Sequence, residues 1–346
     1  MKILVVGPSW VGDMVMAQTL FIALKARDPD TQIDVLAPEW SRPILERMPQ
    51  VAKALSMPIG HGSFELGMRR QLGRQLAAEK YDEAIVLPNS WKSALVPFFA
   101  RIPQRTGWRG EMRYGLLNDI RLLDKKRYPL MIERFIALAH PPGKKLPDSL
   151  PRPELVVDAA NVKACLQGYL LNLEKPVLAL CPGAEFGEAK RWPTNHYATV
   201  AQHKINEGWQ VWLFGSGKDH EVAERIKGQL AEAAQAHCHN LAGETSLADA
   251  VDLMSVADAV VSNDSGLMHI AAALARPLVV VYGSSSPDFT PPLNEQVRVL
   301  RTGIECSPCF KRECPLGHLK CLKDLPAQQV LDSLRQLLDE TVTMTG

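Results

Sequence analysis

Three glycine-containing segments place an ionisable side chain shortly after an apolar run, where it could act on a bound ligand. The first is Gly7–Asp13, which follows the apolar run Ile3–Val6 and opens a helical pattern. It matches neither the G-x-G-x-x-G of dinucleotide folds nor a P-loop, which needs Lys-Ser/Thr. Asp13 therefore has two interpretations. It can favour the start of a helix, or it can remove a proton from a substrate hydroxyl group as a general base.

The second segment, residues 182–193, follows another apolar run. It contains Gly183 and Ala184 and carries the adjacent cations Lys190 and Arg191. Loop N–H groups together with one compact ammonium charge suit a diphosphate. The alternative is a surface loop whose charges are solvated.

The third segment is Asn263–His269. Asp264 and Ser265 are residue types that cap helix N-termini, so the amides from Ser265 and Gly266 onwards should point toward an anion. His269 lies one turn into the same predicted helix. A single histidine is more often a core residue, but this one is placed beside the expected anion.

Two further loops are candidates for binding the base and ribose of a nucleotide. Gly215 and Ser216 follow an apolar run, and Glu221 comes shortly after them. A carboxylate in such a place can accept hydrogen bonds from ribose hydroxyl groups. The other loop contains Leu241, Ala242 and Gly243.

The elements that must position these residues alternate short apolar runs with amphipathic stretches, which is typical of parallel β–α units. The predicted strands are Ile3–Val6, Ile33–Leu36, Ala84–Leu87, Val177–Leu180, Gln210–Phe214, Ala259–Ser262 and Leu278–Tyr282. The predicted helices are Asp13–Ala26, Pro43–Met48, Met68–Glu79, Ala159–Leu170 and Pro326–Leu338. Because the candidate residues follow strands, they should gather at the carboxyl edges of the sheets.

A stretch rich in helix and strand breakers divides the chain. Its 346 residues suit two domains, and residues 141–153 contain Pro141-Pro142-Gly143 and three more prolines. We expect two Rossmann-like α/β domains with parallel sheets, residues 1–155 and 156–346, facing each other across a cleft. The C-terminal helix 326–338 could pack back on the first domain.

Composition and charge narrow the class of protein. Hydrophobic residues make up 46% of the chain and charged residues 22%, which describes a globular protein. Met1-Lys2 leads directly into a strand and not into a signal peptide, so we expect a cytoplasmic protein. Residues 1–160 hold 23 Lys and Arg against 17 Asp and Glu, which suggests an anionic partner. The sequence contains no basic stretch interleaved with aromatic residues, which is the pattern that would indicate nucleic-acid binding.

Four cysteines crowd into one segment, at Cys306, Cys309, Cys314 and Cys321. In a cytosolic protein this spacing favours a small structural zinc site over disulfides. The alternative is a set of reduced thiols that bind nothing. No other cofactor is expected.

Taken together, these segments resemble the lipopolysaccharide heptosyltransferases of glycosyltransferase family 9. The resemblance extends from residue 1 to about residue 300. It is carried by Gly7–Asp13, Leu87–Ser90, Arg105–Asn118, Cys181–Gly187, Lys190–Pro193, Asn240–Thr245 and Asn263–His269. The cysteine segment lies outside the catalytic pattern of that family.

The resemblance implies a GT-B fold with the acceptor on the first domain and ADP-heptose on the second. It further implies an inverting, metal-independent transfer of L-glycero-D-manno-heptose to the first heptose of the inner core, on Hep-Kdo2-lipid A. The enzyme would work peripherally at the cytoplasmic face of the inner membrane. Alternatives are heptosyltransferase I or another core heptosyltransferase of the family and, more distantly, a sugar-nucleotide 2-epimerase, which needs no acceptor.

The resemblance also implies a role for each matching residue. Asp13 would be the general base, Lys190 would bind the diphosphate of the leaving ADP, and Glu221 would hold the ribose. Further donor contacts would come from Gly183, Ala184, Gly215, Ser216, Leu241, Ala242, Gly243, Asp264, Ser265, Gly266 and His269. An anionic acceptor would account for the basic excess of the first domain, so its expected contacts are Lys92, Arg105, Arg109 and Arg113, with Arg69, Arg70 and Arg74 as a second basic patch and Trp10 and Asn89 as further candidates.

Overall fold

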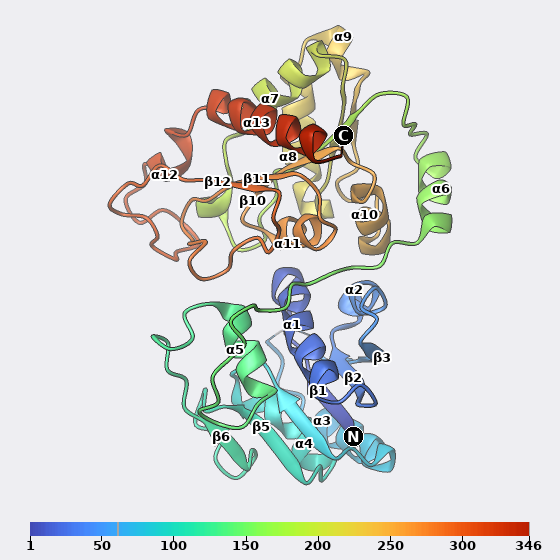
Figure 1. Ribbon diagram of the computed structural model, residues 1–346, viewed down its shortest axis with the longest axis vertical. Coiled ribbons are helices and arrows are strands. Elements are labelled where there is room, and N and C mark those ends of the chain that lie inside the picture. Colours follow the sequence, from blue (N-terminus) through green and yellow to red (C-terminus); the bar gives the residue numbers. More distant parts are fainter. Residues whose placement is uncertain (61, 346) are drawn as a thin grey trace. The chain divides into compact units, whose positions relative to one another are not determined.

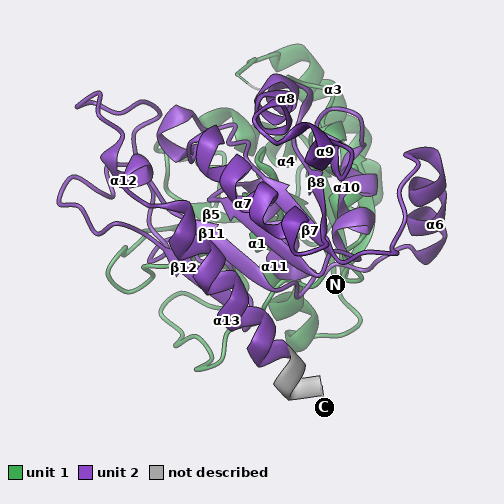
Figure 2. Cartoon of the chain, turned by 90° about the horizontal axis from the view of Figure 1, so that it is seen from above, with its two compact units in different colours: residues 1–154 green, residues 155–346 purple. Residues whose placement is uncertain are grey.

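The chain folds into two compact units, residues 1–154 and 155–346, which Figure 2 distinguishes by colour. The computed structural model describes residues 1–60 and 62–345, with side chains described up to residue 341. Each unit contains its own six-stranded sheet, and all strand pairs within both sheets are parallel. The division falls one residue from the boundary that the prolines suggested.

The first sheet has the strand order β3-β2-β1-β4-β5-β6. Its strands are β1 (Lys2–Val6), β2 (Gln32–Ala37), β3 (Val51–Ser56), β4 (Glu83–Val86), β5 (Gln104–Trp108) and β6 (Asp119–Arg121). The three apolar runs β1, β2 and β4 were predicted. Strands β3, β5 and β6 were not predicted, because polar or exposed residues interrupt the apolar pattern in each of them.

Helices surround this sheet, and one of them presents the first candidate residue. They are α1 (Val11–Arg27), α2 (Arg42–Leu45), α3 (Leu66–Leu76), α4 (Leu95–Phe99) and α5 (Met131–Leu138) (Figure 1). Helix α1 packs along α5 and buries a continuous apolar face that includes Met14, Leu20 and Phe21. Asp13 lies in its first turn and Arg27 in its last, so both charges complement the helix dipole.

The second sheet has the order β12-β11-β10-β7-β8-β9. Its strands are β7 (Val177–Cys181), β8 (Gln210–Leu213), β9 (Cys238–Asn240), β10 (Ala259–Asn263), β11 (Leu278–Val281) and β12 (Val297–Leu300). Every residue of β7, β8, β10 and β11 is buried. Strands covered on both faces read as continuous apolar runs, which is why these four were predicted while the more polar β9 and the less buried β12 were not.

The helices of the second unit cover both faces of that sheet. They are α6 (Ala159–Gly168), α7 (Thr194–Asn206), α8 (His220–Gly228), α9 (Glu232–Gln235), α10 (Leu247–Met254), α11 (Gly266–Ala273), α12 (Lys320–Lys323) and α13 (Ala327–Thr345) (Figure 1). Helix α13 packs on α7 and on β10, β11 and β12. Its buried Leu331, Leu334 and Leu337 belong to the core of this unit. No helix in the described part of the chain is long and apolar enough to cross a membrane.

In both sheets, the first strand in sequence lies inside the sheet, and later strands are added first on one side of it and then on the other. Strand β1 has β2 on one side and β4 on the other, and β7 has β8 on one side and β10 on the other. Loops that leave two neighbouring strands in opposite directions open a crevice at the carboxyl edge, where open α/β sheets bind ligands. The loops after β1 and β4, and after β7 and β10, are therefore where each unit should bind a substrate.

Candidate functional site

Lys190 and Asp264 form an ion pair at the crevice of the second sheet. Lys190 Nζ lies 2.6 Å from Asp264 Oδ2, and the two side chains are 18% and 4% exposed. Lys190 ends a short 3₁₀ turn after β7, and Asp264 follows β10. Asp264 also accepts a hydrogen bond from Ser285 Oγ, in the loop after β11. Three neighbouring strands thus deliver three polar side chains to one point.

Buried Asn263 fixes the backbone around this pair. Its Nδ2 donates to the carbonyl oxygen of Pro182 at 2.6 Å. Its Oδ1 accepts from the backbone N–H of Trp192 and from the Tyr197 hydroxyl, both at 3.0 Å. The loop that carries Gly183 and Lys190 is therefore tied at both ends to the last residue of β10.

The first turn of α11 follows this pair directly. Ser265 occupies the N-cap position, but its hydroxyl does not cap the helix, contrary to the expectation from its residue type. Ser265 Oγ lies 3.3 Å from Ser262 Oγ instead, and the Asp264 carboxylate bonds to Lys190. The N-terminal amides of α11 keep their capacity to bind an external anion.

His269 lies in the same helix and is 5% exposed. Burial lowers its pKa to about 4, while the negative charge of Asp264 acts in the opposite direction and Lys190 lowers the pKa further. The imidazole is therefore neutral at physiological pH. It can offer a ligand one N–H donor and one acceptor nitrogen, but no positive charge.

The glycine turns after β7, β8 and β9 lie against one another. The backbone N–H of Gly243 donates to the carbonyl oxygen of Gly215 at 3.0 Å. A Cβ on Gly243 would lie 2.7 Å from the Cα of Gly217, so any side chain there would push the turns apart. Leu241 and Ala242 are buried beside them. These predicted donor residues form one continuous edge.

Asp219 holds the residues of this edge in place through hydrogen bonds, and it was not among the site residues predicted from the sequence. It is 6% exposed and accepts hydrogen bonds from the backbone N–H and the hydroxyl of Ser216, at 3.0 and 2.8 Å. A Cβ on Gly183 would lie 2.5 Å from its carboxyl group. Glu221, the predicted ribose ligand, lies exposed in the first turn of α8. The spacing Ser216-x-x-Asp219 is a capping-box signal that could have identified the residue.

The loop after β11 contributes two further hydroxyl groups that were not predicted. Ser285 bonds to Asp264, as described above. Within the described residues, Ser284 Oγ is buried without a hydrogen-bond partner, and the Ser284 N–H donates to the carbonyl oxygen of Ala189 at 3.1 Å. An unpartnered buried hydroxyl is costly unless a ligand satisfies it. The run of three serines after Gly283 is the sequence signal that could have identified these hydroxyl groups.

In the first unit, Asp13 lies at the crevice between β1 and β4. A Cβ on Gly7 would lie 2.8 Å from Met14 Cε and 3.3 Å from Ala37 Cβ, so glycine lets the turn approach α1 and β2. Trp10 occupies the N-cap position of α1 without a side-chain cap and is 38% exposed. Asp13 is half-buried in the following turn. The carboxylate thus stands where a ligand of this sheet should bind.

Arg113 is a correction to the predicted acceptor residues. Its side chain is fully buried, and it donates to the carbonyl oxygens of Pro88 and Trp108 and to Ser93 Oγ. Burial lowers its pKa to about 10, so it stays charged. Arg113 therefore braces the loop after β4 from the inside and cannot contact an acceptor.

Arg105 and Arg69 are also held by backbone carbonyl groups. Arg105 is the second residue of β5, and its guanidinium group donates to the carbonyl oxygens of Leu116 and Ile102, at 2.6 and 2.5 Å. Arg69 is 5% exposed and donates to the carbonyl oxygens of residues 63, 64 and 92. Arg69 is therefore not available to an acceptor, whereas the Arg105 side chain stays partly exposed.

Three predicted acceptor residues lie at the carboxyl edge of the first sheet. Asn89 and Lys92 follow β4, and exposed Arg109 follows β5. A Cβ on Gly110 would collide with the Asn89 carbonyl oxygen, and the Glu111 N–H donates to that oxygen at 3.1 Å. The loops after β4 and β5 are therefore joined beside the Asp13 turn.

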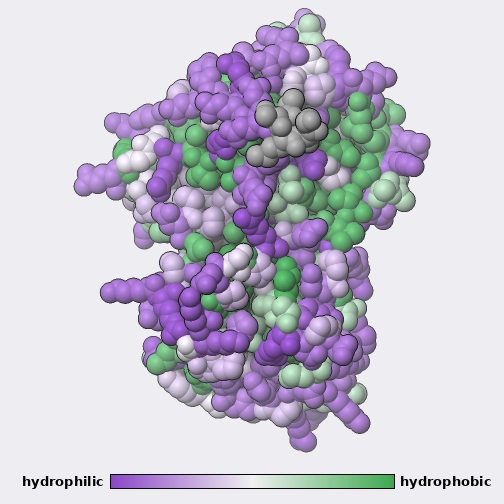
Figure 3. Space-filling model, in the orientation of Figure 1, coloured by the Kyte–Doolittle hydropathy of each residue, from purple (hydrophilic) through white to green (hydrophobic). Residues whose placement is uncertain are grey.

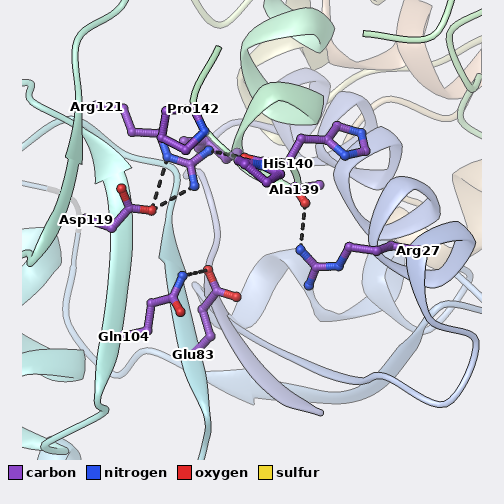
Figure 4. Close-up of a pocket in the computed structure, with 10 residues that line it drawn as sticks. Arg27, Glu83, Gln104, Asp119, Arg121, Ala139, His140 and Pro142 are labelled. Carbon is purple, nitrogen blue, oxygen red and sulfur yellow. Dashed lines mark hydrogen bonds and ion pairs between the residues drawn. The ribbon is translucent and has the colours of Figure 1, made fainter. Parts of the chain in front are cut away.

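A pocket of about 320 Å³ lies at the opposite edge of the first sheet (Figure 4). Glu83, Gln104 and Asp119 begin strands β4, β5 and β6 and line it. Arg121 bonds to Asp119 at 2.7 Å and to carbonyl oxygens at the end of α5, and Arg27 donates to Ala139 O. These groups fasten the end of α5, and the pocket is not the predicted site.

Comparison with known proteins extends the similarity through both units. A model of glycosyltransferase family 9 (heptosyltransferase) matches residues 69–320. The chain is 55% identical to lipopolysaccharide heptosyltransferase 2 of Salmonella typhimurium, over 98% of this chain and 99% of that protein. It is 48% identical to lipooligosaccharide heptosyltransferase 2 of Haemophilus influenzae, with the same coverage. The solved structure of E. coli ADP-heptose LPS heptosyltransferase II matches with a TM-score of 0.90 at 53% identity, covering 99% of both chains.

Proposed function

This chain belongs to glycosyltransferase family 9, and we propose that it transfers L-glycero-D-manno-heptose from ADP-heptose to the first heptose of the lipopolysaccharide inner core, on Hep-Kdo2-lipid A. The observation that carries the proposal is the ion pair of Lys190 and Asp264 beside the start of α11, in a chain similar along its whole length to heptosyltransferases 2. That arrangement suits a sugar-nucleotide diphosphate.

The second unit supplies the donor chemistry in this proposal. The diphosphate binds Lys190 Nζ and the first amides of α11. As the bond between the anomeric carbon and the diphosphate oxygen breaks, negative charge grows on ADP, and these groups stabilise it where it develops. The base and ribose lie along the edge formed by Gly215, Ser216 and Gly243, with Glu221 at the ribose.

The first unit supplies the acceptor chemistry. The Asp13 carboxylate accepts the proton of the acceptor hydroxyl while that oxygen attacks the anomeric carbon from the side opposite ADP. A single displacement of this kind inverts the configuration of the anomeric carbon. A half-buried carboxylate at the carboxyl edge of a sheet is a group of the right type and place for this step.

Mass spectrometry of the products tests the proposed substrate pair. Given ADP-heptose, the enzyme should add one heptose to an acceptor that already carries one and leave the heptose-free Kdo2-lipid A unchanged. Extension of the heptose-free acceptor instead would assign the chain to heptosyltransferase I. Conversion of the nucleotide sugar with no acceptor present would favour the 2-epimerase reaction and contradict the transfer.

We further infer that the enzyme meets its lipid-linked acceptor while bound peripherally at the cytoplasmic face of the inner membrane. Exposed aromatic side chains follow each of the strands β1 to β5 in the first unit: Trp10, Trp40, Phe64, Trp91 and Tyr114. Figure 3 shows a mainly hydrophilic surface with smaller apolar patches on the visible face. Exposed aromatic rings suit a membrane interface, and Lys92 and Arg109 would contact anionic phosphate groups.

Replacing both Lys92 and Arg109 with glutamine should raise the KM for the lipid-linked acceptor several-fold and leave the KM for ADP-heptose unchanged. These contacts lie near solvent, so added salt should weaken acceptor use by the wild type more than by the variant. Retention on anionic phospholipid vesicles should fall in the same variant. Lys163→Gln, on exposed α6, is the matched control. Equal losses for donor and acceptor would contradict this assignment.

A further inference from the structure

The cysteine segment, residues 306–321, follows β12 and ends in α12. Its four cysteines are free thiols. Within the described residues, no three His, Cys, Asp or Glu side chains have the geometry to hold a metal ion, so the structural zinc expected from the sequence stays a prediction. The contacts that the structure does show for this segment are with the loops after β7 and β11.

The backbone of the cysteine segment is fastened to these two loops. The Ala189 N–H donates to the Arg312 carbonyl oxygen at 3.0 Å, and the Phe310 N–H donates to the Ser284 carbonyl oxygen at 2.7 Å. A Cβ on Gly187 would collide with the same Arg312 carbonyl oxygen, so glycine lets the two backbones approach. The backbone at Arg312 is therefore fixed beside the turn that carries Lys190.

The aromatic ring of Phe186 brings two cationic side chains together in this region. Lys190 Nζ lies 5.0 Å from the centroid of the ring, and Arg312 Cζ lies 5.6 Å from it. A cation at such a distance is attracted by the electron-rich face of an aromatic ring. Phe186 is half-buried and Arg312 is exposed, so the ring orients a guanidinium group that solvent can still reach. The two positive charges thus lie around one side chain.

The cations in the loops after β7 and β8 are already paired with carboxylates. Three ion pairs are found there, and they are Lys190–Asp264, Arg191–Asp219 and Lys218–Glu185. Their charges cancel, His269 is neutral, and exposed Glu188 adds a negative charge in the turn that carries Lys190. In the described part of the chain, no carboxylate is paired with Arg312. Arg312 is therefore the cation of this region whose charge is available to an anion.

We propose that Arg312 is a second cation of the donor site and binds the diphosphate of ADP-heptose together with Lys190, an inference that rests on the proposed function. Each phosphate of the donor carries a negative charge, and departure of the sugar adds another. Lys190 shares its charge with Asp264, so a further cation is needed to balance the diphosphate. Guanidinium N–H groups match the geometry of phosphate oxygens. The cysteine segment serves the reaction by delivering this side chain.

Calorimetric titration with ADP tests the contact directly. Arg312→Gln should weaken ADP binding by about tenfold, the effect of losing one charge-assisted hydrogen bond, and Arg312→Lys should recover most of the affinity. Lys311→Gln removes the same charge from the adjacent exposed residue and is the matched control, which should bind ADP as the wild type does. An ADP affinity in Arg312→Gln equal to that of the wild type would overturn the proposal.

Two further measurements separate a contact with phosphate from a general loss of loop structure. Adenosine, which has no phosphate, should bind Arg312→Gln and the wild type equally well. Added salt should weaken ADP binding less steeply in Arg312→Gln, because one exposed charge contact is already gone. Equal losses of affinity for adenosine and ADP would show that Arg312 acts only through the loop, which contradicts the proposed contact.

The result for Arg312 can be told apart from the result for the proposed function. A wild type that adds heptose to the one-heptose acceptor, with no loss of ADP affinity in Arg312→Gln, would contradict this inference alone. A wild type that binds UDP or GDP and not ADP would contradict the donor assignment, and this inference with it.

Discussion

Replacing Asp13 with alanine should lower the turnover of the enzyme by about 10²–10⁴-fold, the usual contribution of a general base. The carboxylate lies half-buried at the crevice between β1 and β4, in the first turn of α1. Without it, no other group is assigned to take the proton of the acceptor hydroxyl as that oxygen attacks. Single-turnover kinetics with saturating substrates measures the loss directly. The affinity for ADP-heptose should be unchanged, because the proposed donor contacts are Lys190 and α11, in the second unit.

Two controls separate catalysis from stability in this experiment. Asp13 also favours the helix start, so its loss should lower stability by about 0.3–1 kcal/mol, which a thermal melt would detect. Asp13→Asn keeps the size of the side chain and should lose activity to the same degree. Asp30→Asn, an exposed carboxylate just beyond the other end of α1, should behave as wild type. Turnover near that of wild type in Asp13→Ala would remove this residue from the proton transfer.

Lys190→Ala should raise the KM for ADP-heptose and lower kcat by about 10²–10³-fold, as expected when one preorganised donor to a developing negative charge is lost. Lys190 Nζ pairs with Asp264, which directly precedes α11 at the crevice of the second sheet. The substitution removes both ground-state affinity for the diphosphate and stabilisation of the leaving group. Calorimetric titration with ADP measures the first effect, and steady-state kinetics measures both. Unchanged ADP affinity would contradict the assignment.

This variant also leaves Asp264 buried without its ion-pair partner, so stability must be measured alongside activity. A cost on the order of 2 kcal/mol is expected, below the roughly 3–5 kcal/mol for fully buried pairs because Lys190 is partly exposed. The double variant Lys190→Ala/Asp264→Asn should recover stability but not ADP binding. Lys218→Ala, whose exposed ion pair with Glu185 lies in the same unit, is the matched control.

The strands that the sequence predicted are those made up almost entirely of apolar residues. Runs such as Ile3–Val6 and Leu278–Tyr282 are apolar because helices cover both faces of their sheets. Strand β6 consists of Asp119, Ile120 and Arg121, and two of its three side chains form an ion pair. A short edge strand of this composition resembles a loop until its partner is known.

Sequence spacing placed the candidate residues in loops at the carboxyl ends of the strands, but it did not predict which of their charged side chains are exposed. Arg109 and Arg113 are both arginines near the end of β5, yet one is exposed and the other is fully buried. The difference depends on the carbonyl oxygens of Pro88 and Trp108, which converge on Arg113 only after the loops have folded. Likewise, Asp219 and Glu221 are two residues apart, and only the capping geometry turns Asp219 inward.

The short contact between Lys190 and Asp264 has a consequence for the catalytic cycle. In the proposed donor site, an incoming diphosphate competes for an ammonium group that already bonds to the Asp264 carboxylate at 2.6 Å. When ADP departs, that carboxylate is in place to reclaim its partner. Under this proposal Asp264 competes with ADP for Lys190, which weakens nucleotide binding and favours release of the product.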